Sequence, residues 1–360
     1  MSSSLASSVT SIVNDGYRVA DAQGQKVYGS PTVTKIAAPF AVSVSPATQT
    51  GGAQSGGSQT YTVTVKNLGY RTDSYNLTST TGAFGVSFYN SACTTPQSST
   101  PSLIAGASSD VCVKVSVPSG TADGTTETAT VTATSVGSPT VHASANIKTI
   151  AVTVNTLLVD EDGNSPDVRS YYATALTGAG VAFDVWDLNA EPTLPVKYME
   201  AFHNIVWFTG NSYPGPVQPY ERNLTAYLNN GGHLLMSGQD ILDQAAGTTL
   251  FVQTYLHINW DGSETQNDKE TSSVHAVAGS LTDGVGAVPL DHSVLGAAFE
   301  DQITPNDGAS RIFTDDTGAA DALSFSGTYK VVFLAFPLEA YGSATQKANL
   351  VTRVMTFFGS

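Results

Sequence analysis

Charged side chains are scarce in this chain of 360 residues. Only 12% of the residues are charged, about half the share of an ordinary soluble domain. Lysine and arginine together number 15 against 30 aspartates and glutamates, which gives a net charge of −15. No stretch holds the basic cluster that binding to a phosphate backbone requires. The composition therefore argues against a nucleic-acid partner and an anionic membrane surface, while it permits divalent cations.

Long apolar runs and cysteines are equally few. No window approaches the ~20 apolar residues of a membrane span, so we expect no transmembrane segment. The two cysteines, Cys93 and Cys112, lie in one β-rich stretch without a nearby cluster of histidines, which argues against zinc. We predict a disulfide, which would stabilise the fold by about 3 kcal/mol. Because disulfides persist in oxidising compartments, the pair indicates a secreted or cell-surface protein.

Residues 39–154 have the alternating pattern of an antiparallel β-sandwich. In the segment YTVTVKNLG, Tyr61, Val63 and Val65 fall on one face and a turn follows at Asn67. Successive side chains of a strand point to opposite faces, so a period of two with closely spaced turns is typical of such sheets. The same alternation occurs in residues 111–118, 126–135 and 147–154.

The segment before the sandwich, residues 1–38, contains two or three strand-like runs separated by turns. These are too few to close a sheet, and an isolated hairpin is marginally stable in water. We therefore expect a strand-rich arm that packs on something else. It would be either the tail of a preceding repeat or a set of donor strands for another chain.

The pattern changes near residue 155. Short continuous apolar runs now alternate with helix-like segments that carry apolar residues on one face. This alternation indicates a mainly parallel sheet covered by helices on both faces. We predict a three-layer α/β domain over residues 155–360, in which an acidic, loop-rich stretch at about 259–325 holds short strands and a large insertion. The expected strands are 156–160, 181–187, 204–210, 233–238 and 329–336, and the expected helices are 167–180, 217–232 and 344–358.

Two parts of the chain resemble known families. The segments SQTYTVTVKNLGYRTDSYNLT and VCVKVSVP carry the patterns Tyr-x-Val-x-Val-x-Asn-x-Gly, Tyr-x-Leu and Val-x-Val-Pro. They resemble the immunoglobulin-like accessory domains that follow the catalytic domain of large secreted bacterial proteins. The resemblance implies an immunoglobulin-like β-sandwich over residues 39–154.

The second resemblance covers residues 155–358. The segments LLVDEDG, IVWFTGN, YLNNGGHLLMSGQD and VVFLAFPLEAY resemble a module in the C-terminal regions of bacterial subtilisin-like serine peptidases. Its sheet is similar to that of class I glutamine amidotransferases, which implies a flavodoxin- or amidotransferase-like topology. The resemblance implies a secreted, multidomain setting without implying peptidase activity, since the chain has no Gly-Thr-Ser-Met-Ala-like nucleophile segment.

The amidotransferase nucleophile is a thiolate on a tight turn between a strand and a helix. That turn reads MSGQDIL here, with Ser237 at the nucleophile's position, and both cysteines lie in the other domain. The segment also departs from Gly-x-Ser-x-Gly. We therefore predict no catalytic residue and interpret Ser237 as a small residue at a crowded turn, with Gln239 or Asp240 capping the next helix. A catalytic Ser237 is the alternative.

The stretch LLVDEDGNSPDV ends an apolar run with four carboxylates. We favour a structural role, in which Asp162, Asn164 or Ser165 caps the following helix and Asp167 lies in its first turn. The alternatives are a bound Ca²⁺ or Mg²⁺, held by Asp160, Asp162 and Asn164, and a pair of catalytic acids. The EF-hand pattern fails, because its sixth position requires glycine and its twelfth glutamate.

Asp160 is predicted at the carboxyl end of the first strand of the second domain, where ligands bind in open α/β sheets. Other polar residues follow neighbouring strands and are expected at the same edge. The sequence therefore predicts a ligand crevice formed by Asp160, Asn211, Ser237, Gln239 and Glu339.

The sequence has clear strand and helix patterns but no set of residues arranged for catalysis, and this combination leads to a functional hypothesis. We expect a non-catalytic accessory or structural region of a secreted bacterial protein that mediates surface or protein–protein contacts, with no cofactor beyond the cation considered above. The first alternative is a self-assembling extracellular filament or surface-layer subunit, in which residues 1–38 add strands to a neighbouring copy. The second is a peptidase-associated hydrolase.

Overall fold

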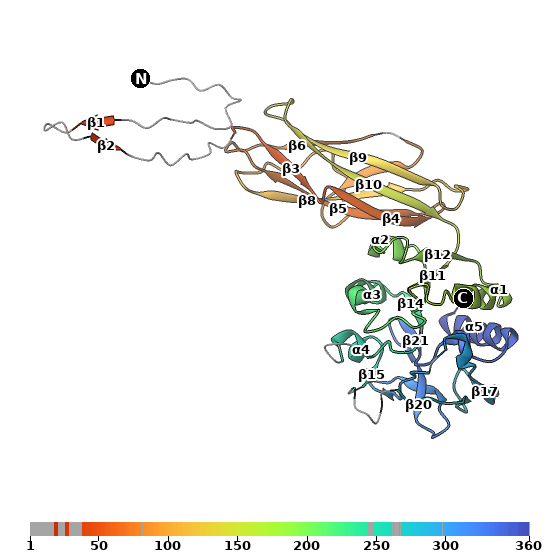
Figure 1. Ribbon diagram of the computed structural model, residues 1–360. Coiled ribbons are helices and arrows are strands. Elements are labelled where there is room, and N and C mark those ends of the chain that lie inside the picture. Colours follow the sequence, from red (N-terminus) through yellow and green to blue (C-terminus); the bar gives the residue numbers. More distant parts are fainter. Residues whose placement is uncertain are drawn as a thin grey trace. The chain divides into compact units, whose positions relative to one another are not determined.

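The structure is a computed structural model, drawn in Figure 1. The chain forms two compact units. The first comprises Met1–Gln49, Ser58–Pro118 and Glu127–Thr149, and the second comprises Thr50–Gly57, Ser119–Thr126 and Ile150–Ser360. No helix in the described part of the chain is long and apolar enough to cross a bilayer. The structure describes residues 18–20, 26–28, 38–80, 82–243, 248–260, 262, 266, 268–296 and 298–359.

Two short strands are described in the N-terminal arm. β1 (Arg18–Ala20) and β2 (Lys26–Tyr28) pair antiparallel and form a two-stranded sheet of their own. Strand-like runs predicted for residues 1–38 are therefore observed at these two places. The rest of the arm up to residue 37 lies outside the described residues.

The β-rich region that follows consists of two four-stranded sheets, as expected for an immunoglobulin-like sandwich. The side chains of Tyr61, Val63 and Val65 are buried, as the alternation predicted. One sheet has the order β3 (Val42–Ser45), β5 (Ser58–Asn67), β8 (Ser108–Ser116) and β7 (Gly85–Tyr89). The other has the order β4 (Thr48–Gln54), β10 (His142–Val152), β9 (Thr126–Ser135) and β6 (Tyr75–Ser79).

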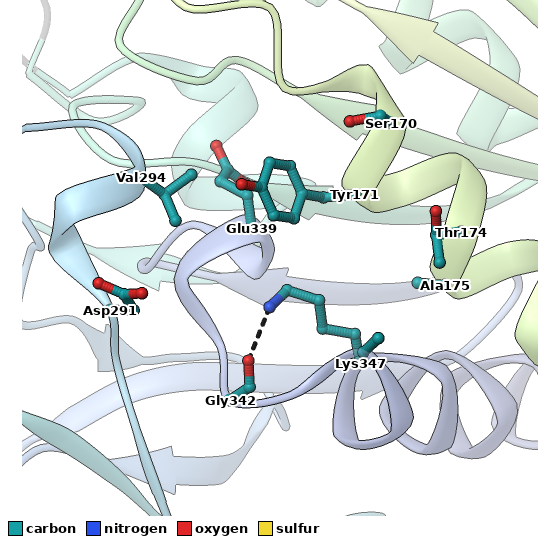
Figure 2. Close-up of a pocket in the computed structure, with 10 residues that line it drawn as sticks. Ser170, Tyr171, Thr174, Ala175, Asp291, Val294, Glu339, Gly342 and Lys347 are labelled. Atoms are coloured by element: carbon teal, nitrogen blue, oxygen red, sulfur yellow. Dashed lines mark hydrogen bonds between the residues drawn. The ribbon is translucent and has the colours of Figure 1, made fainter.

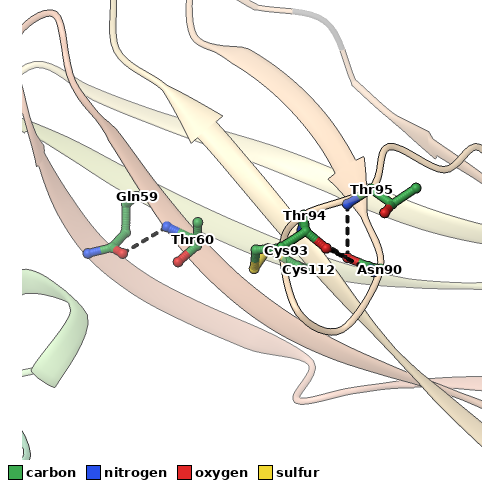
Figure 3. The surroundings of a disulfide bond; sticks show 7 residues. All are labelled: Gln59, Thr60, Asn90, Cys93, Thr94, Thr95 and Cys112. Carbon is green, nitrogen blue, oxygen red and sulfur yellow. Dashed lines mark hydrogen bonds between the residues drawn. A yellow bond between two sulfur atoms is a disulfide. The ribbon is translucent and has the colours of Figure 1, made fainter.

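The predicted disulfide between Cys93 and Cys112 is present, with the two Cα atoms 5.4 Å apart. Figure 3 shows that it joins β8 to the loop after β7. The side chain of Asn90 shapes that loop, because its Oδ1 accepts the main-chain N–H groups of Thr94 at 2.9 Å and Thr95 at 3.1 Å. The bond therefore fastens a loop that has its own hydrogen-bonded turn.

The second unit is built on a nine-stranded sheet with the order β12-β11-β13-β14-β21-β20-β19-β16-β17. The first five strands are parallel, as predicted, and the other four extend the sheet antiparallel. The parallel strands are β11 (Thr156–Asp160), β12 (Phe183–Asp187), β13 (Asn204–Phe208), β14 (His233–Ser237) and β21 (Lys330–Leu334). The antiparallel strands are β20 (Ala320–Ser326), β19 (Ser310–Thr314), β16 (Ser273–Ala276) and β17 (Ala287–Pro289).

Both faces of this sheet are covered. Leu157 and Val159 belong to one buried apolar cluster and Leu158 to another, because alternate side chains of β11 point to opposite faces. The first cluster is covered by α2 (Val196–Met199), α3 (Glu221–Asn229) and α4 (Leu250–Thr254). The second is covered by α1 (Arg169–Gly178) and α5 (Ala344–Phe358). Figure 1 shows α3 and α4 on one side of the sheet and α1 and α5 on the other.

Local sequence sets the bounds of the last helix. Ser343 caps α5 and forms a capping box with Gln346, and Gly359 ends the helix in the left-handed conformation at φ 90°. The apolar face predicted for residues 344–358 is buried, and it includes the stem of Lys347.

The insertion predicted at about 259–325 contributes more to the sheet than expected. It contains β16, β17, β19 and β20, which extend the parallel part on one side. A separate two-stranded sheet joins β15 (Ile258–Asn259) to β18 (Thr304–Pro305), and a 3₁₀ turn, η2, covers His292–Val294. The acidic, loop-rich sequence therefore forms one edge of the main sheet instead of a separate loop region.

Candidate functional site

The register of the parallel strands brings the predicted residues to one edge of the sheet. Asp160 lies opposite Phe208 at the end of β13, and Phe208 lies opposite Ser237 at the end of β14. Ser237 in turn lies opposite Leu334 at the end of β21. The carboxyl ends of four neighbouring strands thus share one edge, as parallel pairing requires.

Asp160 is fully buried and forms an ion pair with the side chain of Arg169. Arg169 at the start of α1 donates from Nε to Asp160 Oδ2 at 2.6 Å and from Nη2 to Asp187 Oδ2 at 2.9 Å. Burial and the charge of Asp162 together raise the pKa of Asp160 to about 6, against the opposing effects of the Asp162 amide and the guanidinium. One arginine therefore compensates the carboxylates that end two neighbouring strands.

Asp162 and Asp167 complete a compact acidic cluster. One oxygen each of Asp160, Asp162 and Asp167 lies within 4.8 Å of the others. The two oxygens of Asp162 accept the main-chain N–H groups of Asn164 and Val168, both at 2.7 Å. Of the predicted cation ligands, the structure therefore brings Asp160 and Asp162 together with Asp167, and Asn164 takes part through its main-chain N–H.

The predicted cap of α1 needs correction. The residue at the N-cap of the helix is Val168, and no side chain caps it. Asp162 instead binds the amide of Val168 from across the loop, and Asp167 lies before the helix, where it accepts the N–H of Arg169 at 3.1 Å. The helix begins at Arg169 instead of the predicted 167, and the carboxylates accept main-chain N–H groups of the preceding turn and of the first helical residue.

Glu161 is a site residue that the sequence did not single out. Its Oε2 accepts the indole N–H of Trp207 at 2.6 Å. Burial raises the pKa of this carboxyl well above its usual range, and the hydrogen bond from the indole opposes the rise. A tryptophan in the middle of a strand gives no signal that its N–H reaches a neighbouring loop.

Ser237 is the last residue of β14, directly before the turn, and its side chain is buried. Its hydroxyl donates to the carbonyl of Phe336 at 3.1 Å and accepts the main-chain N–H of Leu338 at 2.8 Å. The next residue, Gly238, has no room for a side chain, because an added Cβ would clash with Thr209 Oγ1. The turn is crowded, as predicted. The proton of the hydroxyl faces a carbonyl oxygen, which does not activate a nucleophile.

Gln239 and Asn211 link this edge to the insertion. Gln239 donates to Asn211 Oδ1, Asn211 Nδ2 donates to the carbonyl of Leu295 at 2.9 Å, and the N–H of Phe299 donates to Gln239 Oε1 at 3.3 Å. The prediction that Gln239 or Asp240 caps the next helix is wrong. Among the described residues the next helix is α4, which begins at Leu250 and is capped by Thr249.

Glu339 lies in a buried 3₁₀ turn, η3 (Leu338–Ala340), after β21. Its Oε2 accepts the hydroxyl of Tyr172 at 2.5 Å, and the same hydroxyl lies 3.2 Å from Ser237 Oγ. Its Oε1 has no hydrogen-bond partner among the described residues. Burial raises the pKa of Glu339 to about 7. Tyr172 therefore joins Ser237 to Glu339 and leaves one carboxyl oxygen unsatisfied.

A cavity of about 390 Å³ lies beside Glu339. Figure 2 shows Lys347 reaching across it, with Asp291 on the far side, and the Nζ of Lys347 donates to the carbonyl of Gly342 at 2.8 Å. The ammonium also lies 5.6 Å from the centre of the Tyr171 ring, and burial lowers the pKa of Lys347. The walls are therefore polar and carry both signs of charge. The lining residues are Ser170, Tyr171, Thr174, Ala175, Asp291, Val294, Glu339, Gly342, Ala344 and Lys347.

The crevice predicted from the sequence resolves into three hydrogen-bond networks. Ser237 and Glu339 are joined through Tyr172, Asn211 and Gln239 contact each other, and Asp160 belongs to the ion pair with Arg169. The sequence missed Tyr172, Arg169 and Lys347. Tyr172 and Lys347 lie on helices, and their positions carry the same pattern as core-facing residues.

No protein-family model and no curated protein matches the chain. Several solved structures match parts of it. A PapD-like domain of human CEP192 is 14% identical and covers 35% of this chain and 92% of that chain, with a TM-score of 0.24. The secreted serine protease VesC from Vibrio cholerae is 17% identical and covers 36% of this chain and 24% of that chain, with a TM-score of 0.23. A family 123 glycoside hydrolase from Clostridium perfringens is 6% identical and covers 55% of this chain and 48% of that chain, with a TM-score of 0.24.

These likenesses are weak and partial. Immunoglobulin-like domains and secreted Vibrio proteases are among the structural neighbours, and the match spans about a quarter of the length of VesC. The similarity concerns the fold alone and assigns no activity. The chemistry of the site is therefore argued from its own residues.

Proposed function

We propose that this chain is a non-catalytic accessory region of a secreted bacterial protein, and that its second unit recognises a protein partner through the cavity beside Glu339. The proposal is carried by the contrast between Ser237 and Glu339. The hydroxyl of Ser237 is buried and hydrogen-bonded to main-chain groups, whereas Glu339 lines the cavity with an unsatisfied oxygen. A donor of the partner would satisfy this buried acceptor once the cavity wall shifts to admit it, while nucleophilic catalysis requires an accessible nucleophile beside a base.

The walls of the cavity indicate what the partner supplies. Leaving a buried acceptor without a hydrogen bond costs about 1–3 kcal/mol, so a donor that reaches Glu339 Oε1 is favoured. Asp291 adds a second carboxylate to the lining, and the Nζ of Lys347 already donates a hydrogen bond to the carbonyl of Gly342. The partner therefore places a hydrogen-bond-donating side chain, such as a hydroxyl or an amine, into the cavity.

The architecture supports the setting of this proposal. The parallel strands have the order β12-β11-β13-β14-β21, in which the first strand along the chain lies between the second and the third. This is the doubly wound order of flavodoxin-like sheets, so we propose an amidotransferase-like scaffold with Ser237 where the thiolate would be. The disulfide of the first unit supports an oxidising compartment.

Binding and labelling of the intact chain test the proposal. On an array of peptides of varied sequence, bound spots should weaken at least tenfold with Glu339→Gln and persist with Ser237→Ala and with Asp283→Asn, an exposed acid outside the cavity. A fluorophosphonate serine probe should leave Ser237 unlabelled. Labelling of Ser237, or hydrolysis of esters or peptides that is lost in an Asp160→Asn, Ser237→Ala double variant, would instead establish the hydrolase alternative.

Self-assembly through the arm is a second candidate, supported by one observation. Among the described residues, β1 and β2 pair only with each other, and a lone pair of strands gains stability by joining another sheet. Deleting residues 1–38 should then abolish polymers that electron microscopy detects for the full chain. Polymers that persist after the deletion contradict a strand-donor role.

A further inference from the structure

A second group of carboxylates lies at the edge of the same sheet, on segments far apart in the sequence. Asp240 follows β14, Asp321 lies in β20, and Glu300 and Asp301 precede β18. None of them belongs to the cluster around Asp160 or lines the cavity beside Glu339.

Main-chain hydrogen bonds hold the segments of this group in place. The N–H of Phe299 donates to Gln239 Oε1 at 3.3 Å, which fixes the chain just before Glu300 against the turn after β14. The N–H of Ile303 donates to the carbonyl of Ala320 at 2.8 Å, which fixes the chain just after Asp301 against β20. The fold therefore gathers the carboxylates even though they repel one another.

The four side chains are withdrawn from water and incompletely paired. Their exposed fractions are 8% for Asp240, 0% for Glu300, 3% for Asp301 and 1% for Asp321. Asp301 Oδ1 and Asp321 Oδ2 have no hydrogen-bond partner among the described residues, and Glu300 Oε1 lies 3.1 Å from His292 Nδ1. A buried carboxylate oxygen without a partner is unfavourable, so these oxygens are available to a ligand inside the group.

Like charges dominate the electrostatic surroundings of the group, and His292 beside Glu300 opposes them. Burial, with a smaller contribution from three neighbouring carboxylates, raises the pKa of Asp240 to about 7. Burial and neighbouring carboxylates raise the pKa of Asp301 to about 8, against a main-chain hydrogen bond from Asp268. Burial also raises the pKa of Asp321 well above its usual range, and each charge that acts on it is another carboxylate.

We propose that Asp240, Glu300, Asp301 and Asp321 form a binding site for one Ca²⁺ ion. Carboxylate oxygens are hard ligands, and Ca²⁺ accepts about 6–8 of them in a flexible geometry. Mg²⁺ demands a near-octahedral shell and retains several waters, which suits a buried and irregular set of side chains less well. The group has no thiolate, which argues against a structural zinc site.

Ion binding draws the four carboxylates together. Among the described residues, the cluster of Asp160, Asp162 and Asp167 is the one set of three whose ligand oxygens already lie within 4.8 Å of each other. Those oxygens accept hydrogen bonds from Arg169 and from main-chain amides. Asp301 Oδ1 and Asp321 Oδ2 have no hydrogen bond to lose when they turn toward an ion, whereas Glu300 would have to give up part of its contact with His292. The two groups therefore differ mainly in whether their carboxylate oxygens already have hydrogen-bond or ion-pair partners.

Calcium titration of the full chain tests the site. After dialysis against EDTA, calorimetry with CaCl₂ should give one ion bound per chain. The unfolding midpoint of the second unit should rise by about 5–10 °C at a calcium concentration of about 100 times Kd. Asp321→Asn should weaken binding at least 100-fold and remove the rise in midpoint. Far-UV circular dichroism checks that the variant folds, and Asp301→Asn is the second variant should Asp321→Asn not fold.

A matched variant separates the two acidic groups. Asp162→Asn alters the cluster around Asp160 and should leave calcium affinity within threefold of the wild type. The proposal is overturned if the wild-type chain binds no calcium, if Asp321→Asn and Asp301→Asn bind it as tightly as the wild type, or if Asp162→Asn alone abolishes binding.

Discussion

Asp160 and Asp321 are both buried carboxylates at the same edge of one sheet, yet they have different partners. Asp160 has Arg169 at 2.6 Å and the amide of Asp162 at 3.3 Å. Asp321 has an oxygen without a hydrogen bond, and the charges around it are those of other carboxylates. The number of acids close together is therefore a poor guide to a cation site. A better guide is whether each carboxylate oxygen already has a hydrogen bond or an ion pair.

The comparison also bears on the cation site that the sequence offered as an alternative to a structural role. The acids of LLVDEDGNSPDV are contiguous and look like a cation loop, and in the structure they hold main-chain amides and an arginine. The acids of the second group are scattered along the chain and come together only through the fold. Three experiments can break or sharpen this contrast.

The largest effect is expected from Arg169→Met. The substitution leaves Asp160 buried and without its cation, so we expect the free energy of unfolding at pH 7.5 to fall by about 3 kcal/mol. Urea denaturation of the second unit measures the loss. The loss should shrink at pH 5, because Asp160, with a pKa of about 6, is then protonated.

The double variant Arg169→Met, Asp160→Asn is the control. It removes the uncompensated charge and should recover most of the lost stability. A double variant as unstable as Arg169→Met alone would show that the packing of the arginine stem, not its charge, stabilises this edge.

Smaller effects are expected at the two aspartates, and we expect the two substitutions to differ in sign. In EDTA at pH 7.5, Asp160→Asn should lower the free energy of unfolding by about 1–2 kcal/mol, because it loses hydrogen bonds to a charged group. Asp321→Asn should leave it unchanged or raise it by about 1 kcal/mol, because it removes a buried acid among like charges. Equal losses in parallel urea titrations would mean that the two environments do not differ as described.

The smallest effect concerns Glu339 and the pH dependence of stability. Its pKa in the folded chain is about 7, above its unfolded value of about 4.5, so the native state binds the proton more tightly. Stability from this group is therefore present below pH 4.5 and is lost as the pH rises toward 7. The midpoint of the wild type should fall by about 2–4 °C more between pH 5 and pH 7.5 than that of Glu339→Gln. Identical pH profiles would place the proton elsewhere.

Strong periodicity made much of the fold predictable. The bounds of β9, β11 and α5 match the predicted segments 126–135, 156–160 and 344–358, because alternation, a continuous apolar run and a capped amphipathic face are local signals. The antiparallel extension of the sheet was not predicted. β17 has three residues with one buried, and the pairing of β19 with β20 is irregular, so neither leaves a readable period.

The site was predictable only in part. Asp160, Ser237 and Glu339 were placed at the edge because each follows a recognisable strand. Their partners depend on contacts between distant segments, such as the hydroxyl of Tyr172, which reaches Glu339 from α1. Local sequence patterns contain no information about these contacts.

Arginine and lysine are not interchangeable at position 169. The planar guanidinium of Arg169 presents separate edges to Asp160 and Asp187, at the ends of two adjacent strands. A lysine at this position would preserve the net charge and yet supply a single ammonium, which reaches one carboxylate at a time. Relatives that carry lysine here would be expected to have a second base nearby or a neutral residue at one of the two aspartate positions.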